Sequence, residues 1–325
     1  MRAWVVERNG EPADVLRLVD REPPTPGPGE LCVDVSAAAV GMPDVFLCRG
    51  TYAFSPTIPF TPGQEAVGVV TGVGDGVALE VGARVMGVTA FVDGRGGFAE
   101  RTVIAAANAF PVPDEMDDAH AASFRIGSST AWIALVRRAV LAPGEDLVVL
   151  GAAGGSGLAA VQLGHALGAR VLAVVAGSEK AAACRQLGAD VAIDRERAEV
   201  RDAVLAATDG RGADVVFDPV GGAPGEDAMR WVAGGGRYLA VGFAAGRWPT
   251  VDVARLVGRS FSVLGVYAGA YGRAENEADH AALLALVATG ALRSPVTRTM
   301  DFGEVPEALA AVAAATTVGK IVVST

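Results

Sequence analysis

Residues 146–175, DLVVLGAAGGSGLAAVQLGHALGARVLAVV, decide the fold of this chain. The β-rich run 146–150 stops at a group of small residues, 151–157, and a helical stretch follows. After it a second apolar run, 170–175, again has the composition of a strand. A strand, a glycine-rich turn, a helix and a strand in this order form the βαβ unit that binds a dinucleotide, because a pyrophosphate needs bare backbone N–H groups at the positive end of a helix.

The turn itself carries the spacing Ala152-x-Gly154-x-x-Gly157, with Gly155 and Ser156 between its two glycines. In the usual fingerprint the first position is glycine as well. Small-residue turns are common in a chain with 42 glycines among 325 residues, so a tight turn without a ligand is the alternative interpretation. The strand before the turn, and the helix and strand after it, favour dinucleotide binding.

The residues after the second strand indicate which dinucleotide is bound. NAD is held by a carboxylate at the tip of this strand, and no acid stands there. Ser178 and Lys180 follow the tip, and Arg195 follows the next strand-like run. A hydroxyl and two cations suit a 2′-phosphate, so NADPH is the predicted cofactor. Glu179 is expected to face solvent, and the alternative is that Lys180 is an ordinary surface lysine.

Composition and charge limit the class of protein. A length of 325 residues is typical of two domains. No apolar run approaches 18 residues, and Arg2 and Glu7 interrupt the start, so neither a membrane span nor a leader is expected. The net charge, 27 − 37 = −10, disfavours nucleic acid as a partner. Three scattered cysteines, Cys32, Cys48 and Cys184, fit a reducing compartment, which predicts a cytoplasmic protein.

Two domains of different character are predicted along the chain. Residues 1 to about 122 are short β runs broken by Gly and Pro, which predicts a small barrel-like β domain. From position 146 strands and helices alternate, which predicts a parallel, doubly wound sheet. The last run, GKIVVST, follows a helix and is expected to return to the β domain. The predicted domains are therefore 1–123 with 267–325, and 124–266.

Eight short motifs occur in an order that is typical of one protein family. They are FTPGQEAVGVV (60–70), GGFAER (96–101), STAW (129–132), GAAGGSG (151–157), LGAD (187–190), DPVGG (218–222), VGFAAG (241–246) and GVYAGAY (265–271). On these residues the chain resembles the zinc-independent quinone oxidoreductases related to zeta-crystallin, within the medium-chain dehydrogenase/reductase superfamily. The resemblance covers essentially the whole length.

The resemblance implies a fold, a set of cofactor contacts and an assembly. The expected fold is α/β, a GroES-like β domain plus a Rossmann domain with a doubly wound parallel sheet, with NADPH in the cleft between them. By resemblance, the nicotinamide half is lined by Thr130, Gly242, Phe243 and the backbone of Val266 and Tyr267. The implied homodimer is joined through the strand near 261–266, and an apolar edge strand invites such pairing.

Three positions depart from the family's pattern. Gly41 stands where many relatives carry Asn beside the substrate and the nicotinamide ribose, so no side chain there can donate that hydrogen bond. Ser156 replaces the usual Val of the glycine turn. Arg195 stands where relatives often have Tyr beside the 2′-phosphate, and a guanidinium can serve there as well.

The residues do not supply a set of zinc ligands. Zinc alcohol dehydrogenases of the superfamily carry a Cys-His pair where this chain has 41–44, Gly-Met-Pro-Asp, and Gly-His-Glu where it has 63–65, Gly-Gln-Glu. The three histidines, His120, His165 and His280, are isolated in predicted helices. No metal is therefore expected, and without a Lewis acid the oxidation of an alcohol is disfavoured.

Hydride transfer without a metal requires an activated acceptor. A quinone, or an alkene conjugated to a carbonyl, spreads the incoming charge onto oxygen, and the protein then orients the acceptor and excludes water. Tyr52 is the candidate catalytic residue, as a hydrogen-bond or proton donor, and Gly41, Tyr52 and Tyr271 are the expected substrate pocket. That Tyr52 only packs in its loop is the alternative, and Tyr267 and Tyr271 are the other polar candidates.

The predicted function is an NADPH-dependent, metal-independent reductase of quinones or α,β-unsaturated carbonyls. The related alternative is a reductase of enoyl thioesters, acting on acyl-CoA or polyketide substrates. A non-catalytic NADPH-binding protein is the third interpretation, which Gly41 keeps open. The partners expected are a small-molecule acceptor and a second copy of the chain, with neither nucleic acid nor membrane.

Overall fold

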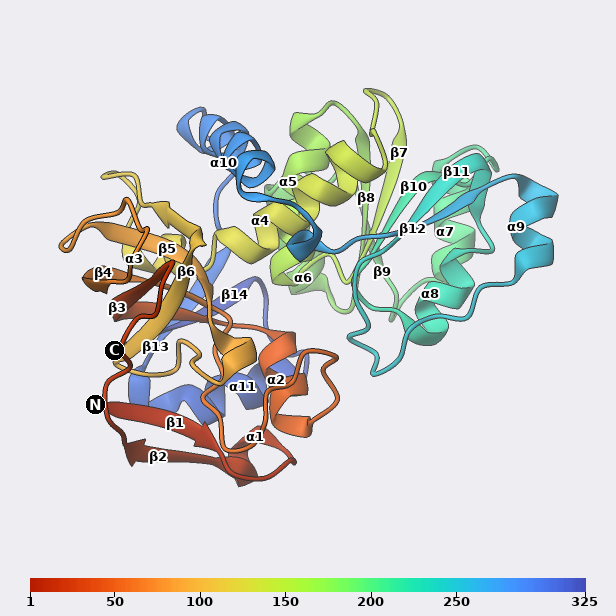
Figure 1. Cartoon of the computed structure of the whole chain (residues 1–325). Helices are drawn as coiled ribbons and strands as arrows, with labels where there is room; N and C mark the ends of the chain where they lie inside the picture. The colour runs from red at the N-terminus through yellow and green to blue at the C-terminus, as the bar shows by residue number, and fades with distance from the viewer. The chain divides into compact units, whose positions relative to one another are not determined.

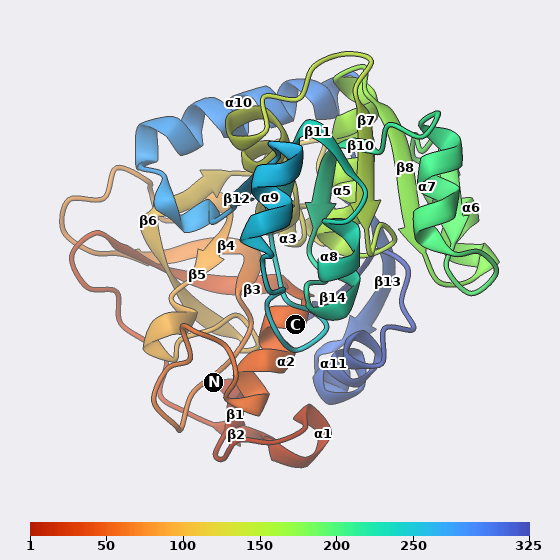
Figure 2. The same cartoon turned by 90° about the vertical axis from the view of Figure 1, so that its right-hand side faces the viewer.

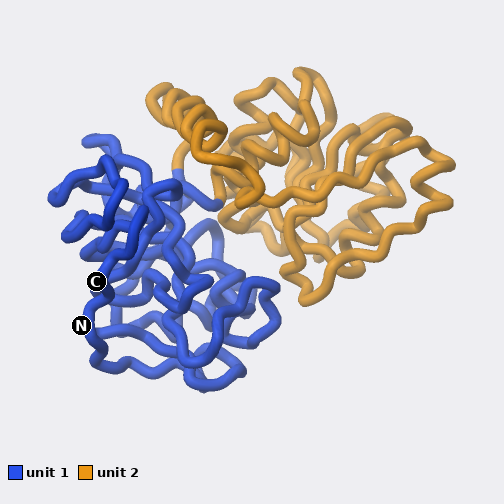
Figure 3. Tube along the Cα trace, viewed as in Figure 1, with its two compact units in different colours: residues 1–126, 294–325 blue, residues 127–293 orange.

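The computed structural model describes all of residues 1–325, and the chain divides into two compact units (Figure 3). Unit 1 consists of Met1–Ile126 and Ser294–Thr325, and unit 2 of Gly127–Arg293. The sequence places the boundaries at 123/124 and 266/267, whereas the contacts place them at 126/127 and 293/294. The second boundary differs because α10 (Arg273–Ala288) belongs to unit 2.

Side chains far apart in the sequence hold α10 in unit 2. Asp279 of α10 is buried and accepts hydrogen bonds from Trp132 Nε1 at 2.9 Å and from Arg137 Nε at 2.8 Å. The bonded residues are more than 140 positions apart in the sequence, so no local sequence pattern predicts these bonds. A buried carboxylate that is paired with a guanidinium is a strong constraint, because breaking the pair would leave an uncompensated charge.

Unit 1 contains a six-stranded sheet in the order β13-β14-β3-β4-β5-β6 and a two-stranded sheet of β1 and β2. Because β3 pairs with β6 as well as with β4, strands β3 to β6 close on themselves as a small barrel. The strands are β1 (Arg2–Val6), β2 (Leu16–Asp20), β3 (Glu30–Val40), β4 (Glu65–Val73), β5 (Arg84–Thr89), β6 (Arg101–Pro111), β13 (Val296–Asp301) and β14 (Lys320–Ser324); the helices are α1 (Pro12–Val15), α2 (Met42–Arg49), α3 (Asp118–Ala122) and α11 (Val305–Ala313), with short 3₁₀ turns at Phe91–Asp93 and Phe302–Glu304.

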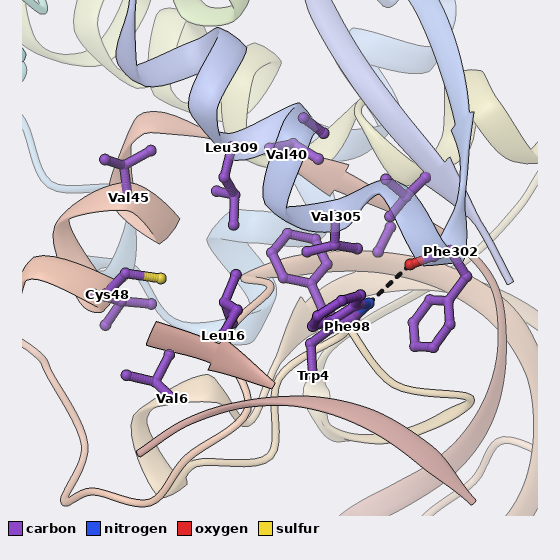
Figure 4. Packing of buried hydrophobic residues seen from close by; sticks show 14 of the residues in the cluster. Trp4, Val6, Leu16, Val40, Val45, Cys48, Phe98, Phe302, Val305 and Leu309 are labelled. Atoms are coloured by element: carbon purple, nitrogen blue, oxygen red, sulfur yellow. Dashed lines mark hydrogen bonds between the residues drawn. The ribbon is translucent and has the colours of Figure 1, made fainter. Parts of the chain in front are cut away.

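The core of unit 1 joins its first strand to its last helix (Figure 4). Trp4 of β1 is buried beside Phe98, and its indole Nε1 donates a hydrogen bond to the carbonyl of Phe302 at 2.8 Å. Val305 and Leu309 of α11 pack into the same cluster. The C-terminal segment, including GKIVVST as β14, therefore completes the domain that the N-terminus begins.

Unit 2 contains one parallel sheet in the order β12-β11-β10-β7-β8-β9, with α5 on one side and α7 and α8 on the other (Figures 1 and 2). Its strands are β7 (Asp146–Leu150), β8 (Arg170–Val175), β9 (Val191–Asp194), β10 (Ala213–Asp218), β11 (Val232–Ala240) and β12 (Ser262–Gly265); its helices are α5 (Gly155–Ala166), α6 (Ser178–Gln186), α7 (Val200–Ala207), α8 (Gly222–Ala228), α9 (Val253–Arg259) and α10, with a 3₁₀ turn at Ala268–Ala270. Helix α4 (Arg125–Trp132) and the π-helical turn Ile133–Arg138 lead into the sheet.

The predicted fold class is confirmed: a GroES-like β domain plus a Rossmann domain with a doubly wound parallel sheet. The strand order reverses between β7 and β10, which is the switch point where such sheets bind ligands at their carboxyl ends. No helix combines the length and the apolar character that crossing a bilayer would require. All three cysteines are buried and unpaired, and burial raises the pKa of Cys48 and of Cys184 to about 12.

Candidate functional site

The turn between β7 and α5 is shaped by the absence of side chains. A Cβ at Gly157 would lie 2.5 Å from the carbonyl oxygen of Gly151 and 2.8 Å from that of Ala152, so only glycine lets the helix approach the strand this closely. A Cβ at Gly154 would meet only the Gly151 carbonyl, at 3.4 Å, so this side of the turn is open. Ala152 is fully buried, which explains why alanine is tolerated at the first position of the fingerprint.

Helix α5 begins without a capping side chain. Gly154 is its N-cap, and the first turn, Gly155-Ser156-Gly157, presents backbone N–H groups that no helical carbonyl can use. A helix start of this kind attracts an anion, through its free donors and through the positive end of the helix dipole. The open glycine face and the uncapped helix start therefore fit a pyrophosphate.

The tips of β8 and β9 lie next to each other. The Arg195 N–H donates to the Val175 carbonyl at 2.9 Å, and the Gly177 N–H donates to Asp194 Oδ1 at 2.9 Å. Ser178 begins α6 directly after Gly177, and Lys180 stands in its first turn. The structure thus brings the three predicted phosphate-binding residues to one corner of the sheet.

The carboxylate at this corner is already engaged. Asp194 accepts hydrogen bonds from the N–H groups of Gly177 and Glu196, and these bonds hold its pKa below the usual range. Oδ1 accepts both bonds and so holds the two loops together, and Oδ2 lies 3.7 Å from Arg197 Nε. Glu196 adds a second negative charge, since its Oε2 lies 3.9 Å from where a Cβ of Gly177 would stand.

The carboxyl ends of β11 and β12 lie at the opposite end of the row of strand tips from those of β8 and β9. Gly242 lies after β11, where a Cβ would come within 2.8 Å of the Pro219 carbonyl oxygen. The next residue, Phe243, packs on Trp248 with ring centroids 5.0 Å apart. After β12, the Val266 N–H donates to the Ala240 carbonyl at 3.0 Å.

A cavity of about 530 Å³ opens at this end of unit 2. Aromatic rings and one guanidinium dominate its walls. It is lined by Arg138, Ala240, Trp248, Gly265, Val266, Tyr267, Ala270 and Tyr271. Thr130, the remaining cofactor candidate, is half-buried in α4 of the same unit. All predicted cofactor-binding residues therefore belong to unit 2, and those on strand tips form one row from β12 to β9.

The predicted substrate residues are divided between the units. Gly41 and Tyr52 belong to unit 1, whereas Tyr271 belongs to unit 2, where the Arg137 guanidinium stacks 5.1 Å from the centre of its ring. Tyr52 is half-buried, and its ring lies 5.9 Å from that of Phe54 and 6.4 Å from that of Phe91. Packing of the Tyr52 ring is thus part of its role.

Asp44 organises the loops around Gly41. Its Oδ2 accepts from the N–H of Gly41, the N-cap of α2, at 3.0 Å, and its Oδ1 accepts from the N–H groups of Gly63 and Gln64, both at 3.1 Å. The carboxyl is almost completely buried. Burial raises its pKa to about 6, although the Gly41 hydrogen bond and the Lys320 charge oppose the rise.

A second buried acid, Glu65, follows Gln64 directly in the sequence. Glu65 Oε1 accepts from the Ile126 N–H at 2.9 Å, and its Oε2 lies 3.4 Å from Lys320 Nζ of β14. Burial raises the pKa of Glu65, against the opposing charge of Lys320. Glu65, which stands in the Gly-Gln-Glu segment where the zinc enzymes have Gly-His-Glu, therefore ties β4, α4 and β14 together.

No group of three or more His, Cys, Asp or Glu side chains is arranged to hold a metal ion. The histidines are dispersed: His165 is exposed on α5, and the His120 ring bonds Asp117, the N-cap of α3, at 2.8 Å. His280 is buried in α10.

Two buried polar atoms without partners were not predicted from the sequence. Gln64 Nε2 and Ser129 Oγ are enclosed and have no hydrogen-bond partner. The sequence identified Gln64 only as a residue that is not a zinc ligand. Whether an amide or a hydroxyl finds a partner depends on atoms from distant segments, so no sequence signal could have found either one.

Comparisons with known proteins define the class. Residues 27–114 match the alcohol dehydrogenase GroES-like domain, and residues 155–288 match the zinc-binding dehydrogenase family. With the two-unit fold and the glycine turn, these matches define a medium-chain dehydrogenase/reductase.

Relatives narrow the class further. Quinone oxidoreductase-like protein 2 homolog of Nematostella vectensis is 32% identical over 305 residues, which are 92% of this chain and 82% of that protein. Polyketide synthase GfsB of Streptomyces halstedii is 35% identical over 297 residues, which are 91% of this chain but 5% of that protein. The crystal structure of Escherichia coli quinone oxidoreductase complexed with NADPH has a TM-score of 0.93 at 25% identity, with 100% of both chains covered. The chain belongs to the quinone oxidoreductase family of this superfamily.

The raised pKa of Asp44 gives a pH-dependent contribution to stability. Below about pH 4 the carboxyl is protonated in both the folded and the unfolded protein, and above about pH 6 it is ionised in both. Between these values the folded protein holds the proton more tightly, so the contribution of Asp44 to wild-type stability falls as the pH rises. The free energy of unfolding of wild type, minus that of Asp44→Asn, should therefore fall by roughly 1–3 kcal/mol from pH 4 to pH 7 in urea titrations.

The control for this experiment is Asp14→Asn, which removes one negative charge from an exposed position. A difference between wild type and Asp44→Asn that stays constant, or rises, over this pH range would contradict the assignment of a buried, proton-holding carboxyl.

Proposed function

We propose that the protein is an NADPH-dependent, metal-independent reductase that delivers a hydride to a quinone or to an α,β-unsaturated carbonyl. The observation that carries the proposal is the uncapped, glycine-lined start of α5 at the switch point of the sheet, with Ser178, Lys180 and Arg195 at the neighbouring strand tips. The NADPH complex of the Escherichia coli relative supports the choice of cofactor.

Each group of residues at the carboxyl ends of the unit 2 strands has a role in holding NADPH. Ala152, Gly154, Gly155, Ser156 and Gly157 offer backbone to the pyrophosphate. The Ser178 hydroxyl and the cations of Lys180 and Arg195 bind the 2′-phosphate, and the attraction of the two cations outweighs the repulsion from Glu196. The nicotinamide half is lined by Thr130, Gly242, Phe243, Val266 and Tyr267. An acidic chain of net charge −10 thus binds an anion through short-range contacts.

Bound along this row of strand tips, NADPH would supply a hydride to the acceptor, whose oxygen would take up the displaced electron pair and a proton. The residues of the chain orient the acceptor and manage that proton. Tyr52 is the proposed donor of the hydrogen bond or proton, and Gly41 and Tyr271 are proposed for the acceptor pocket. The chemistry needs no metal, because the acceptor itself delocalises the charge.

A second candidate function is the reduction of enoyl thioesters. The 35% identity to a segment of a polyketide synthase favours it, because such synthases process acyl chains carried as thioesters. The two candidates share the cofactor and the hydride step and differ only in the group conjugated to the alkene.

A homodimer and a cytoplasmic location complete the proposal. β12 is the edge strand of its sheet, and Ser262 and Gly265 on it are exposed. Nearby apolar side chains are also exposed, including Trp248, Val253 and Val257. An edge with unpaired backbone groups beside apolar surface is suited to pairing with a second copy. The unpaired cysteines fit a reducing compartment.

Replacing Lys180 by alanine should discriminate between the two nicotinamide cofactors. The change removes a charge-assisted contact to the 2′-phosphate, which NADH lacks, so the Kd for NADPH should rise ~10- to 100-fold while that for NADH changes little. Fluorescence titration measures both constants. Arg201→Ala, at an exposed cation on α7, is the matched control. Equal losses for NADPH and NADH would remove the phosphate-site assignment.

A panel of acceptors should separate the candidate functions. NADPH oxidation is followed with 1,4-benzoquinone, cyclohex-2-enone and crotonyl-CoA, on protein whose zinc content is measured. We expect the highest kcat/KM with the quinone or the enone, and no stoichiometric zinc. Preference for crotonyl-CoA would favour the thioester reductase, and NADPH binding without any oxidation would favour a non-catalytic protein. Stoichiometric zinc would contradict the metal-independent mechanism.

The dimer proposal predicts a mass in solution of twice the 32.9 kDa of one chain. Light scattering gives the mass, and amide hydrogen exchange locates the interface. Exchange at 261–266 should slow as the protein concentration rises, because pairing protects the backbone N–H groups of β12. A mass of 32.9 kDa at all concentrations, or exchange that does not depend on concentration, would contradict this interface.

A further inference from the structure

The side-chain amide of Gln64 is enclosed in unit 1 with no partner for its N–H₂ group. The residue is 5% exposed, and Nε2 makes no hydrogen bond. Gln162 of α5 is equally buried but is fully engaged: its Nε2 donates to the carbonyls of Leu158 and Arg293, and its Oε1 accepts from the Arg293 N–H. Buried amides are normally paired as in Gln162, so the unpaired amide of Gln64 requires an explanation.

Hydrogen bonds hold the backbone of Gly63 and Gln64 on both sides. Its N–H donates to Asp44 Oδ1 at 3.1 Å, and its carbonyl accepts from the Thr89 N–H at 3.0 Å. The preceding Gly63 carbonyl accepts from Thr89 Oγ1 and from the Gly97 N–H, both at 2.7 Å. The backbone from which the amide projects is therefore fixed on both sides.

Gln64 shares its surroundings with the substrate candidates of unit 1. One carboxylate, Asp44, binds the N–H groups of both Gly41 and Gln64. A Cβ at Gly41 would stand 3.5 Å from Asp44 Oδ2, so position 41 adds no side chain to this space. On the other side, Thr89 bonds the Gln64 carbonyl, and Phe91, two residues later, packs on the ring of Tyr52.

We propose that Gln64 is a catalytic residue whose side-chain amide donates a hydrogen bond to the oxygen of the acceptor. The inference rests on the proposed function, and it assigns a donor to a pocket in which Gly41 supplies none. During reduction the hydride's electron pair adds to the acceptor carbon, and the displaced π pair collects on the acceptor oxygen. A fixed N–H donor at that oxygen binds the charged transition state more tightly than the neutral ground state.

The test is Gln64→Met, which keeps the shape of the side chain and removes both N–H groups. Two probes are titrated by ligand-observed NMR in the presence of NADP⁺: cyclohexanone, which has the acceptor oxygen, and methylenecyclohexane, which lacks it. We expect the variant to bind cyclohexanone about ten-fold more weakly, the size of one lost hydrogen bond. Affinity for methylenecyclohexane and for NADPH should be unchanged, and kcat/KM for cyclohex-2-enone should fall at least as far as the cyclohexanone affinity.

Stability separates a ligand-binding amide from a structural one. Replacing an unpaired buried amide by an apolar group of the same shape removes a desolvation penalty, so Gln64→Met should unfold at the same urea concentration as wild type or at a higher one. The matched control is Gln162→Met, which breaks three hydrogen bonds and should lower the urea midpoint without changing the preference for cyclohexanone over methylenecyclohexane.

The outcomes distinguish this inference from the proposed function. A wild-type protein that reduces neither quinone nor enone overturns the function, and the role of Gln64 with it. A wild type that reduces them, with Gln64→Met equally efficient and equally tight for cyclohexanone, overturns the Gln64 assignment alone. Should Gln64→Met fail to fold, Gln64→Asn, which keeps the amide but draws it back by one methylene, replaces it; unchanged cyclohexanone affinity in that variant also overturns the assignment.

Discussion

The close approach of α5 to β7 is the contact on which the candidate site in unit 2 depends. Position 157 has no room for a single methyl group, because the carbonyl oxygen of Gly151 would lie 2.5 Å from it. Any side chain there would push the helix away from the sheet and move the backbone N–H groups that face the ligand. The remaining contacts along the row of strand tips, from Val266 at β12 to Arg195 after β9, are useful only if this helix start is correctly placed.

The start of α5 in unit 2 has no capping side chain, whereas the buried acids of unit 1 are paired. Unit 2 leaves the first turn of α5 uncapped and open, which favours an anionic ligand. Unit 1 encloses Asp44 and Glu65 and satisfies them with backbone donors and with Lys320, so that the acids brace loops. In that carefully paired interior the free amide of Gln64 is an exception, and exceptions of this kind are concentrated at functional sites.

Much of the fold could be predicted from local patterns, because alternation of strands with helices and the glycine turn are properties of short segments. The sequence missed β13 (Val296–Asp301), since four of its six residues are exposed and the strand lacks a regular apolar face. The contact boundary at 293/294 differs from the expected 266/267 because the Asp279–Arg137 pair joins residues that are 142 positions apart in the sequence. The candidate site differs in the same way: the residues proposed to bind phosphate lie next to a glycine turn that is recognisable in the sequence, whereas the surroundings of Tyr52 and Tyr271 depend on long-range packing.

The burial of the cysteines has a consequence for an enzyme of this kind. Quinones and enones are electrophiles that alkylate thiolates, so an oxidoreductase that turns them over risks arylation by its own reactants. Cys32, Cys48 and Cys184 are all enclosed, and the high pKa of the last two keeps their sulfur protonated. The chain thus offers no ready thiolate for Michael addition, and the same packing that stabilises its cores shields its sulfur atoms from the compounds that it is proposed to reduce.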